Sequence, residues 1–163
     1  MSQITAAIRP RPLSSANAGQ SPLGVLAIDG NSIAYRAYFA LPTSIVDKTG
    51  APCNATYGFM SMLIRVLREW RPAGVVVAFD SAWPTLRHRV FPEYKAGRIE
   101  LKPDLLNQVP RLRMLLDHLG ICCCSADGIE ADDLLAAISQ LAVHSETQAL
   151  LVDSRRKLSQ CSR

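Results

Sequence analysis

The sequence predicts an α/β fold with a mainly parallel sheet flanked by helices. Short apolar runs alternate along the chain with longer segments whose apolar residues recur at helical spacing. Two of the apolar runs lead directly into an aspartate, and a third is followed by a cluster of acids. Alternating strands and helices form right-handed crossovers, so we expect parallel strands between two layers of helices.

The composition is that of a globular chain long enough for one domain with a core, with 163 residues, 48% hydrophobic and 20% charged. Residues 153–163 carry +3 of the net charge of +4, so a global basic field does not argue for a nucleic-acid partner. No apolar run approaches the roughly 18 residues of a membrane span, and no signal-peptide pattern begins the chain. We therefore expect a cytoplasmic protein without a membrane partner.

The first third of the chain contains one strand and the clearest helix. Residues 1–23 are rich in Ser, Ala, Pro and Gln and predict a flexible leader. An apolar strand over 24–28 ends at Asp29, and a short helix is expected after it. Asn54 is a plausible N-cap for the next helix, whose apolar stripe ends at Trp70 and predicts a side that faces the core.

The second strand, over 74–79, again runs straight into an aspartate, Asp80. The connection that follows, 81–103, mixes basic and aromatic side chains with three prolines. Long loops of this kind in a compact α/β unit tend to be functional. A helix is expected over 105–119, with Pro110 bending it or resetting its start.

Three adjacent cysteines, Cys122 to Cys124, are expected to form a short buried strand in which free cysteine acts as a small apolar residue. Neighbouring cysteines are badly placed for a disulfide, and no CxxC pair with a second ligand pair indicates zinc. An amphipathic helix then runs to about His144, and an apolar strand follows over 148–152. Residues 153–163 form a basic tail that departs from this pattern.

Acidic residues gather at the start of the last predicted helix. Glu130, Asp132 and Asp133 stand within four positions. Such a cluster raises its own pKa values unless a cation neutralises it, although a solvated helix start or a cap explains any one acid. Because ligands bind at the carboxyl ends of parallel strands, we expect Asp29 and Asp80 at the same edge of the sheet.

The five carboxylates offer only hard oxygen ligands, which suit Mg²⁺ or Mn²⁺ rather than zinc or copper. The set therefore indicates metal-assisted hydrolysis of a phosphodiester. Lys95 and Arg98 could neutralise phosphate charge, and Tyr35 or Tyr94 could stack on a base. Alternatives are a solvated basic loop beside strand-end caps, or a phosphatase, which explains the carboxylates and leaves the 81–103 loop without a role.

Several motifs together resemble the 5′-3′ exonuclease family, which includes the N-terminal nuclease domain of bacterial DNA polymerase I and its free-standing relatives and is similar to flap endonucleases. In chain order they are Leu-Ala-Ile-Asp-Gly-Asn-Ser at 26–32, Tyr-Arg-Ala at 35–37, Asn-Ala-Thr-Tyr-Gly-Phe at 54–59, Ala-Phe-Asp at 78–80, Phe-Pro-Glu-Tyr-Lys-Ala-Gly-Arg at 91–98 and Glu-Ala-Asp-Asp at 130–133. The resemblance implies a PIN-like (Rossmann-like) fold, incomplete at the C-terminus. Residues 24–152 would be the N-terminal part of the nuclease domain, with 81–103 as its arch or clamp.

The resemblance also implies an activity and a set of site residues. The family hydrolyses DNA near 5′ flaps, nicks or single-stranded 5′ ends with two divalent ions, Mg²⁺ or Mn²⁺, and a polymerase domain can accompany it in the parent protein. The implied metal-site acids are Asp29, Asp80, Glu130, Asp132 and Asp133. The implied catalytic cations are Lys95 and Arg98, and the implied DNA-contacting residues are Tyr35, Arg87, Tyr94, Lys95 and Arg98.

The tail departs from the family pattern. After the strand that ends at Val152 the family reads Thr-Gly-Asp, then Arg or Lys, then Asp-Leu, whereas this chain has Arg155 and Lys157 at the two aspartate positions. Because cations replace two acids of the second metal site, we expect one bound ion or none, and an impaired nuclease on a truncated or frame-shifted chain. The alternative is a non-catalytic DNA-binding or interaction fragment.

Overall fold

The computed structural model describes residues 24–81, 84–91, 93–94, 102–153 and 159–161, so the predicted leader lies outside the described part. The α/β prediction is confirmed by one five-stranded sheet in the order β3-β2-β1-β4-β5. Its strands are β1 (Val25–Asp29), β2 (Gly74–Ala78), β3 (Cys122–Cys124), β4 (Ala149–Val152) and β5 (Ser159–Cys161). The first four are parallel, and β5 is antiparallel to β4.

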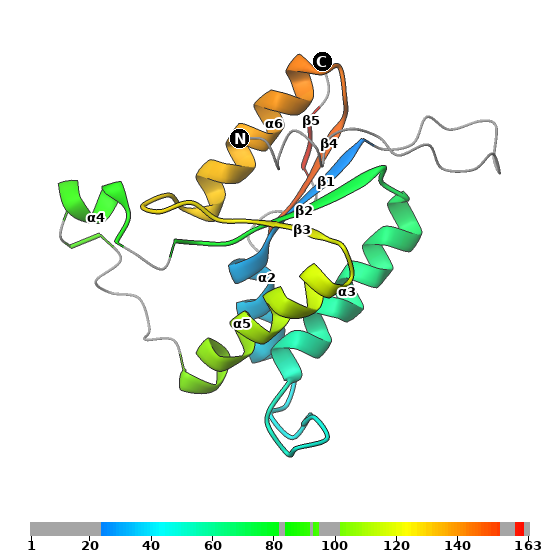
Figure 1. Ribbon diagram of the computed structural model, residues 1–163, viewed down its shortest axis with the longest axis vertical. Coiled ribbons are helices and arrows are strands. Elements are labelled where there is room, and N and C mark those ends of the chain that lie inside the picture. Colours follow the sequence, from blue (N-terminus) through cyan, green and yellow to red (C-terminus); the bar gives the residue numbers. More distant parts are fainter. Residues whose placement is uncertain (1–23, 82–83, 92, 95–101, 154–158, 162–163) are drawn as a thin grey trace.

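Helices cover both faces of this sheet (Figure 1). On one face lie α2 (Gly30–Ala40), α3 (Asn54–Trp70) and α5 (Pro103–His118), and α6 (Ala131–His144) lies on the other. Alternate residues of β1 point to opposite faces, so Leu26 and Ile28 join the core under α3 and α5, while Val25 and Ala27 join the core under α6. The strand is buried on both sides, as its continuous apolar run predicts.

The strand order reverses between β1 and β4. From β1 the chain moves outward to β2 and β3, then crosses back to add β4 on the other side of β1. Ligands of open α/β sheets bind where the strand order reverses in this way. Ile28 is opposite Val152 in the register, so the next residues, Asp29 and Asp153, follow the ends of two adjacent strands at this point.

The predicted cap at the start of α3 was wrong. Asn54 is the first residue of the helix, Cys53 is the N-cap, and the Asn54 side chain is buried. Its Nδ2 donates hydrogen bonds to the carbonyl oxygens of Tyr38, at 2.9 Å, and Leu41, at 3.0 Å. Asn54 therefore ties α3 to the end of α2 instead of capping its own helix, and Gln108 Nε2 donates to its Oδ1 at 3.1 Å.

Two other elements differ from the expectation. Pro110 lies inside α5, which begins at Pro103, so Pro110 does not reset the start of the helix.

The cysteine strand β3 pairs only with β2 at one edge of the sheet, so its cysteines are half-buried rather than buried. Burial raises the pKa of the Cys123 thiol to about 12, and Cys122 to Cys124 are free. They pack against the two cores as small apolar side chains, which agrees with the predicted role although they are only partly buried.

Two short elements were not predicted. Helix α4 (Leu86–Val90) forms within the 81–103 connection, with Thr85 as its N-cap in a capping box with His88. It stands apart from the main body, beyond the carboxyl end of β2 (Figure 1). Strand β5 forms within the predicted basic tail, where Gln160 pairs with Leu150. Both elements are too short for a periodic pattern to reveal them.

Candidate metal centre

Asp29 is one of the two buried acids of the candidate site, with Glu130. It ends β1, caps α2 by accepting a hydrogen bond from the Ser32 N–H at 2.8 Å, and is only 8% exposed. Burial raises its pKa to about 6; the Ser32 bond lowers the pKa, and the negative fields of Asp80, Asp153 and Asp132 raise it further. The structure therefore gathers acids from three separate elements around one buried carboxylate.

Asp153 belongs to this group, and the sequence analysis did not include it. The Ser32 hydroxyl donates a hydrogen bond to Asp153 Oδ1 at 2.6 Å, which links the start of α2 to the end of β4. The missed signal is that β4 runs directly into an aspartate, as does the run that ends at Asp29. In the sequence, Asp153 stands as the first residue of the basic tail.

Asp80 joins the end of β2 to the start of α6. Its Oδ1 accepts a hydrogen bond from the Ala131 N–H at 2.8 Å, and its own N–H donates to Asn31 Oδ1 at 3.3 Å. Ser81 adds a second link, because its hydroxyl accepts a hydrogen bond from the Gly128 N–H at 2.9 Å. These bonds fix the acidic N-terminus of α6 beside the end of β2.

The acids of α6 have three different environments. Asp132 is exposed, whereas Glu130 is only 4% exposed and Asp133 is intermediate. Arg87 contacts both of the latter: its Nη1 lies 2.9 Å from Glu130 Oε2, and its Nη2 lies 2.6 Å from Asp133 Oδ1. Tyr94 also donates its hydroxyl to Glu130 Oε2 at 3.2 Å. Two of the predicted metal-site acids are thus held by side chains of the 81–103 connection.

The donor set fits a hard divalent cation in its chemistry. Asp29, Asp80, Asp132 and Asp153 provide only carboxylate oxygens, the ligands that Mg²⁺ prefers. Burial is the main cause of the raised pKa of Asp29, and a cation beside these acids would offset both the cost of burying its charge and the repulsion from its acidic neighbours. Within the described residues, however, no three His, Cys, Asp or Glu side chains already form a metal-binding group.

The predicted DNA-contacting residues are only partly described. Arg87 and Tyr94 are held against the α6 acids, and Tyr35 lies on α2 with 37% of its surface exposed. The Tyr35 ring packs 4.7 Å from the ring of Phe39, measured between centroids. The other two predicted DNA-contacting residues, Lys95 and Arg98, lie outside the described residues. Arg155 and Lys157, at the positions of the replaced aspartates, also lie outside them.

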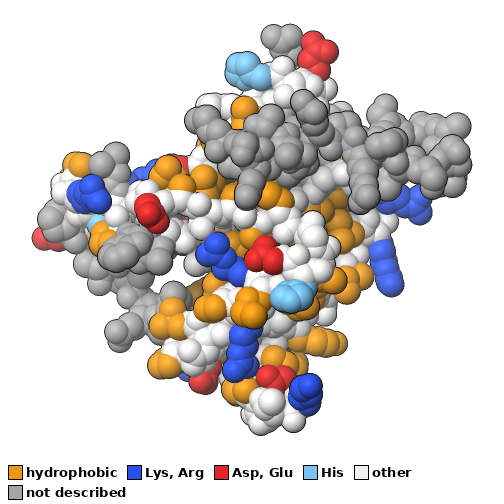
Figure 2. All heavy atoms as spheres, viewed as in Figure 1, with side chains coloured by type: hydrophobic (Ala, Val, Ile, Leu, Met, Phe, Trp, Pro, Cys, Tyr) orange, Lys and Arg blue, Asp and Glu red, His pale blue; other side chains and the backbone are white. Residues whose placement is uncertain are grey.

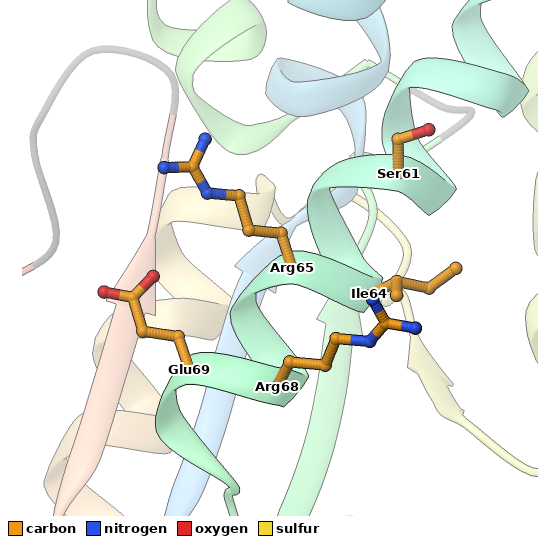
Figure 3. A pocket seen from close by; sticks show the side chains of 5 residues that line it. All are labelled: Ser61, Ile64, Arg65, Arg68 and Glu69. Carbon is orange, nitrogen blue, oxygen red and sulfur yellow. The ribbon is translucent and has the colours of Figure 1, made fainter.

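The described surface has no dominant charge on the face seen in Figure 2, where basic and acidic side chains are scattered among apolar ones. One shallow pocket lies on the outer side of α3 and is lined by Ser61, Ile64, Arg65, Arg68 and Glu69 (Figure 3). None of the candidate metal-site acids lines it.

No helix in the described part combines the length and the apolar character needed to cross a membrane.

The amino-acid sequence of the chain is similar to those of known proteins. The profile described as 5′-3′ exonuclease, N-terminal resolvase-like domain, matches residues 24–163. The chain belongs to the 5′-3′ exonuclease family. Over 136 residues it is 41% identical to DNA polymerase I of Geobacillus stearothermophilus, covering 83% of this chain and 15% of that protein. Over 118 residues it is 42% identical to DNA polymerase I of Bacillus subtilis, covering 72% and 13%. This family member therefore spans about 15% of the length of such relatives.

Solved structures confirm the PIN-like fold of this family member. The T5 D15 protein co-crystallised with metal ions matches with a TM-score of 0.59 at 17% identity, covering 80% of this chain and 48% of that one. The T5 D15 flap endonuclease, in a pseudo-enzyme–product complex with DNA and metal ions, matches with a TM-score of 0.52 at 19% identity, covering 79% and 48%. At these identities the likeness concerns the fold alone.

Proposed function

We propose that the chain is the front part of a divalent-metal-dependent nuclease domain that hydrolyses DNA phosphodiesters at 5′ flaps, nicks or single-stranded 5′ ends. The proposal is supported by the placement of Asp29, Asp80 and Asp153 after the ends of three neighbouring strands, where the strand order reverses, and by the influence of Asp132 on the same buried Asp29. Membership of the 5′-3′ exonuclease family supports the reaction class. A parent protein with a polymerase domain and a cytoplasmic location are proposed on the same basis.

The residues of the chain would share the work of the site as follows. Asp29, Asp80 and Asp132 would hold Mg²⁺ or Mn²⁺, and Ser32 would orient Asp153 beside them. When bound, the cation would neutralise phosphate charge and polarise the scissile phosphodiester. Lys95 and Arg98 would contact the phosphate, and Tyr35 would support the terminal base pair. Glu130 and Asp133 would complete the acidic set once Arg87 no longer occupies them.

The cations at Arg155 and Lys157 would weaken a second metal site, so we expect one bound ion or none, and reduced activity. Asp153 would supply one carboxylate near the weakened position.

A second candidate function is DNA binding without cleavage. The specific observation in its favour is that Arg87 already neutralises Glu130 and Asp133. In addition, the described residues contain no ready-made group of three metal ligands. Phosphate binding by the basic residues alone would then be strongly sensitive to salt.

A cleavage assay separates the two functions. The wild-type chain is incubated with end-labelled 5′-flap DNA and Mg²⁺ or Mn²⁺, beside Asp132→Asn and the matched control Asp127→Asn. Asp127 is exposed and close in sequence, and no contact is described for it. The nuclease proposal predicts products that a chelator abolishes and that Asp132→Asn, but not the control, reduces at least about tenfold. Salt-sensitive binding with no product at any metal concentration would support the second function.

A further inference from the structure

Arg87 forms the centre of a charged contact between two distant segments. It lies on α4, and its guanidinium group spans two acids of the first turn of α6, Glu130 and Asp133. The contact with Asp133 is bidentate, with Nη1 donating to Oδ2 at 2.9 Å and Nη2 to Oδ1 at 2.6 Å. This fork geometry is the strong form of an arginine–carboxylate pair.

Glu130 is held on both of its oxygens by residues from the same connection. Oε1 accepts a hydrogen bond from the Thr85 hydroxyl at 3.3 Å. Oε2 accepts one from the Tyr94 hydroxyl at 3.2 Å and lies 2.9 Å from Arg87 Nη1. Because Glu130 is buried, its charge needs such partners, and among the described residues Arg87 contributes a neutralising positive charge.

A divalent cation and the guanidinium group cannot both take the same oxygens. The other acids of the candidate centre, Asp29, Asp80 and Asp132, have no described contact with Arg87. They could therefore take a cation first, and its field would then repel Arg87 and attract Glu130 and Asp133. If the divalent cation replaced the Arg87 guanidinium, the buried Glu130 would still have a positive partner.

We propose that Arg87 is an internal counter-ion that competes with the divalent cation for Glu130 and Asp133, so that metal binding releases α4 from the N-terminus of α6. The proposal rests on the proposed function, because the cation is the one assigned to Asp29, Asp80 and Asp132. A released Arg87 becomes available to DNA phosphate, which couples metal binding to phosphate binding. Such coupling is reciprocal: phosphate binding at Arg87 would strengthen metal binding by the same factor by which metal binding strengthens phosphate binding.

The test measures the affinity for Mn²⁺ of the full chain by electron paramagnetic resonance at low salt, without DNA. Arg87→Gln removes the competing charge, and we expect Mn²⁺ to bind roughly 5- to 150-fold more tightly than to the wild type. Arg87→Lys keeps the charge without the fork and should gain less. The matched control is Arg89→Gln on the same helix, because Arg89 is exposed and has no described ion pair, and it should leave the affinity unchanged. Circular dichroism verifies that each variant is folded.

A second measurement follows α4 directly. Hydrogen exchange of the backbone amides of residues 88–91 should become faster when Mn²⁺ is added to the wild type, and it should not respond to Mn²⁺ in Arg87→Gln. If wild type and Arg87→Gln bind Mn²⁺ equally or the variant binds more weakly, the Arg87 proposal is overturned and the proposed function stands. If neither protein binds Mn²⁺, both proposals fail.

Discussion

Neutralising Asp29 should stabilise the metal-free protein at neutral pH. Asp29 is buried beside other acids, which raises its pKa from 3.8 to about 6. Between these two pH values the native state holds more protons than the unfolded state, so the free energy of unfolding falls as the pH rises. Above about pH 6 the cost of the ionised carboxylate is fully present. It amounts to about 3 kcal/mol, because each pKa unit corresponds to about 1.4 kcal/mol.

Asp29→Asn removes this cost and keeps an oxygen that can accept the hydrogen bond from the Ser32 N–H. We therefore expect the variant to be up to about 3 kcal/mol more stable than the wild type at pH 8 in a chelator, with the difference vanishing near pH 4. The assay is urea unfolding followed by circular dichroism at several pH values. Added Mg²⁺ should narrow the difference by stabilising the wild type.

Asp47→Asn provides a control of opposite sign. Asp47 is far from the candidate centre in the sequence, and hydrogen bonds from the Thr49 side chain and backbone lower its pKa. Its replacement should therefore destabilise the protein at neutral pH rather than stabilise it. If Asp29→Asn is no more stable than the wild type at pH 8, the account of Asp29 as a repelled, buried carboxylate is incorrect.

Two further predictions concern packing near the site. In Gly30→Ala the new Cβ would lie 2.5 Å from the Phe79 ring. We therefore expect the free energy of unfolding, measured with urea, to fall by about 1–3 kcal/mol. An unchanged unfolding midpoint would contradict the close packing. Gln108→Leu should lower the free energy of unfolding by about 2 kcal/mol or more, because the buried Asn54 side chain and the Ala55 N–H both lose a hydrogen-bond partner. A stability equal to that of the wild type would show that this network is not needed.

Much of the fold could be predicted because the central strand β1 is buried on both faces. Continuous apolar runs and the helical stripes between them predicted a parallel sheet, and the aspartates at strand ends predicted the edge at which we propose the site. The Asn54 cap was wrong because a capping side chain and one that reaches a neighbouring helix look alike in sequence. That choice depends on where the end of α2 lies, which only the tertiary structure shows.

The candidate site was predicted less completely than the fold. Asp80, Asp132 and Asp153 all act on the buried Asp29, and Asp153 was not predicted because it begins a tail whose other residues depart from the family pattern. The ion pairs of Arg87 with the α6 acids join positions 46 residues apart at most and leave no periodic signal in one sequence. Such pairs depend on how α4 folds beside α6, so local patterns could not reveal them.

The most direct test of the central claim is whether the acids at the carboxyl edge of the sheet bind a divalent cation. Mn²⁺ is titrated into the wild-type chain and into Asp132→Asn, with Asp127→Asn as the control, and free Mn²⁺ is measured by electron paramagnetic resonance. The account predicts saturable binding to the wild type and the control, with affinity at least about tenfold lower in Asp132→Asn. Equal affinity in all three proteins, or no binding to the wild type, would contradict it.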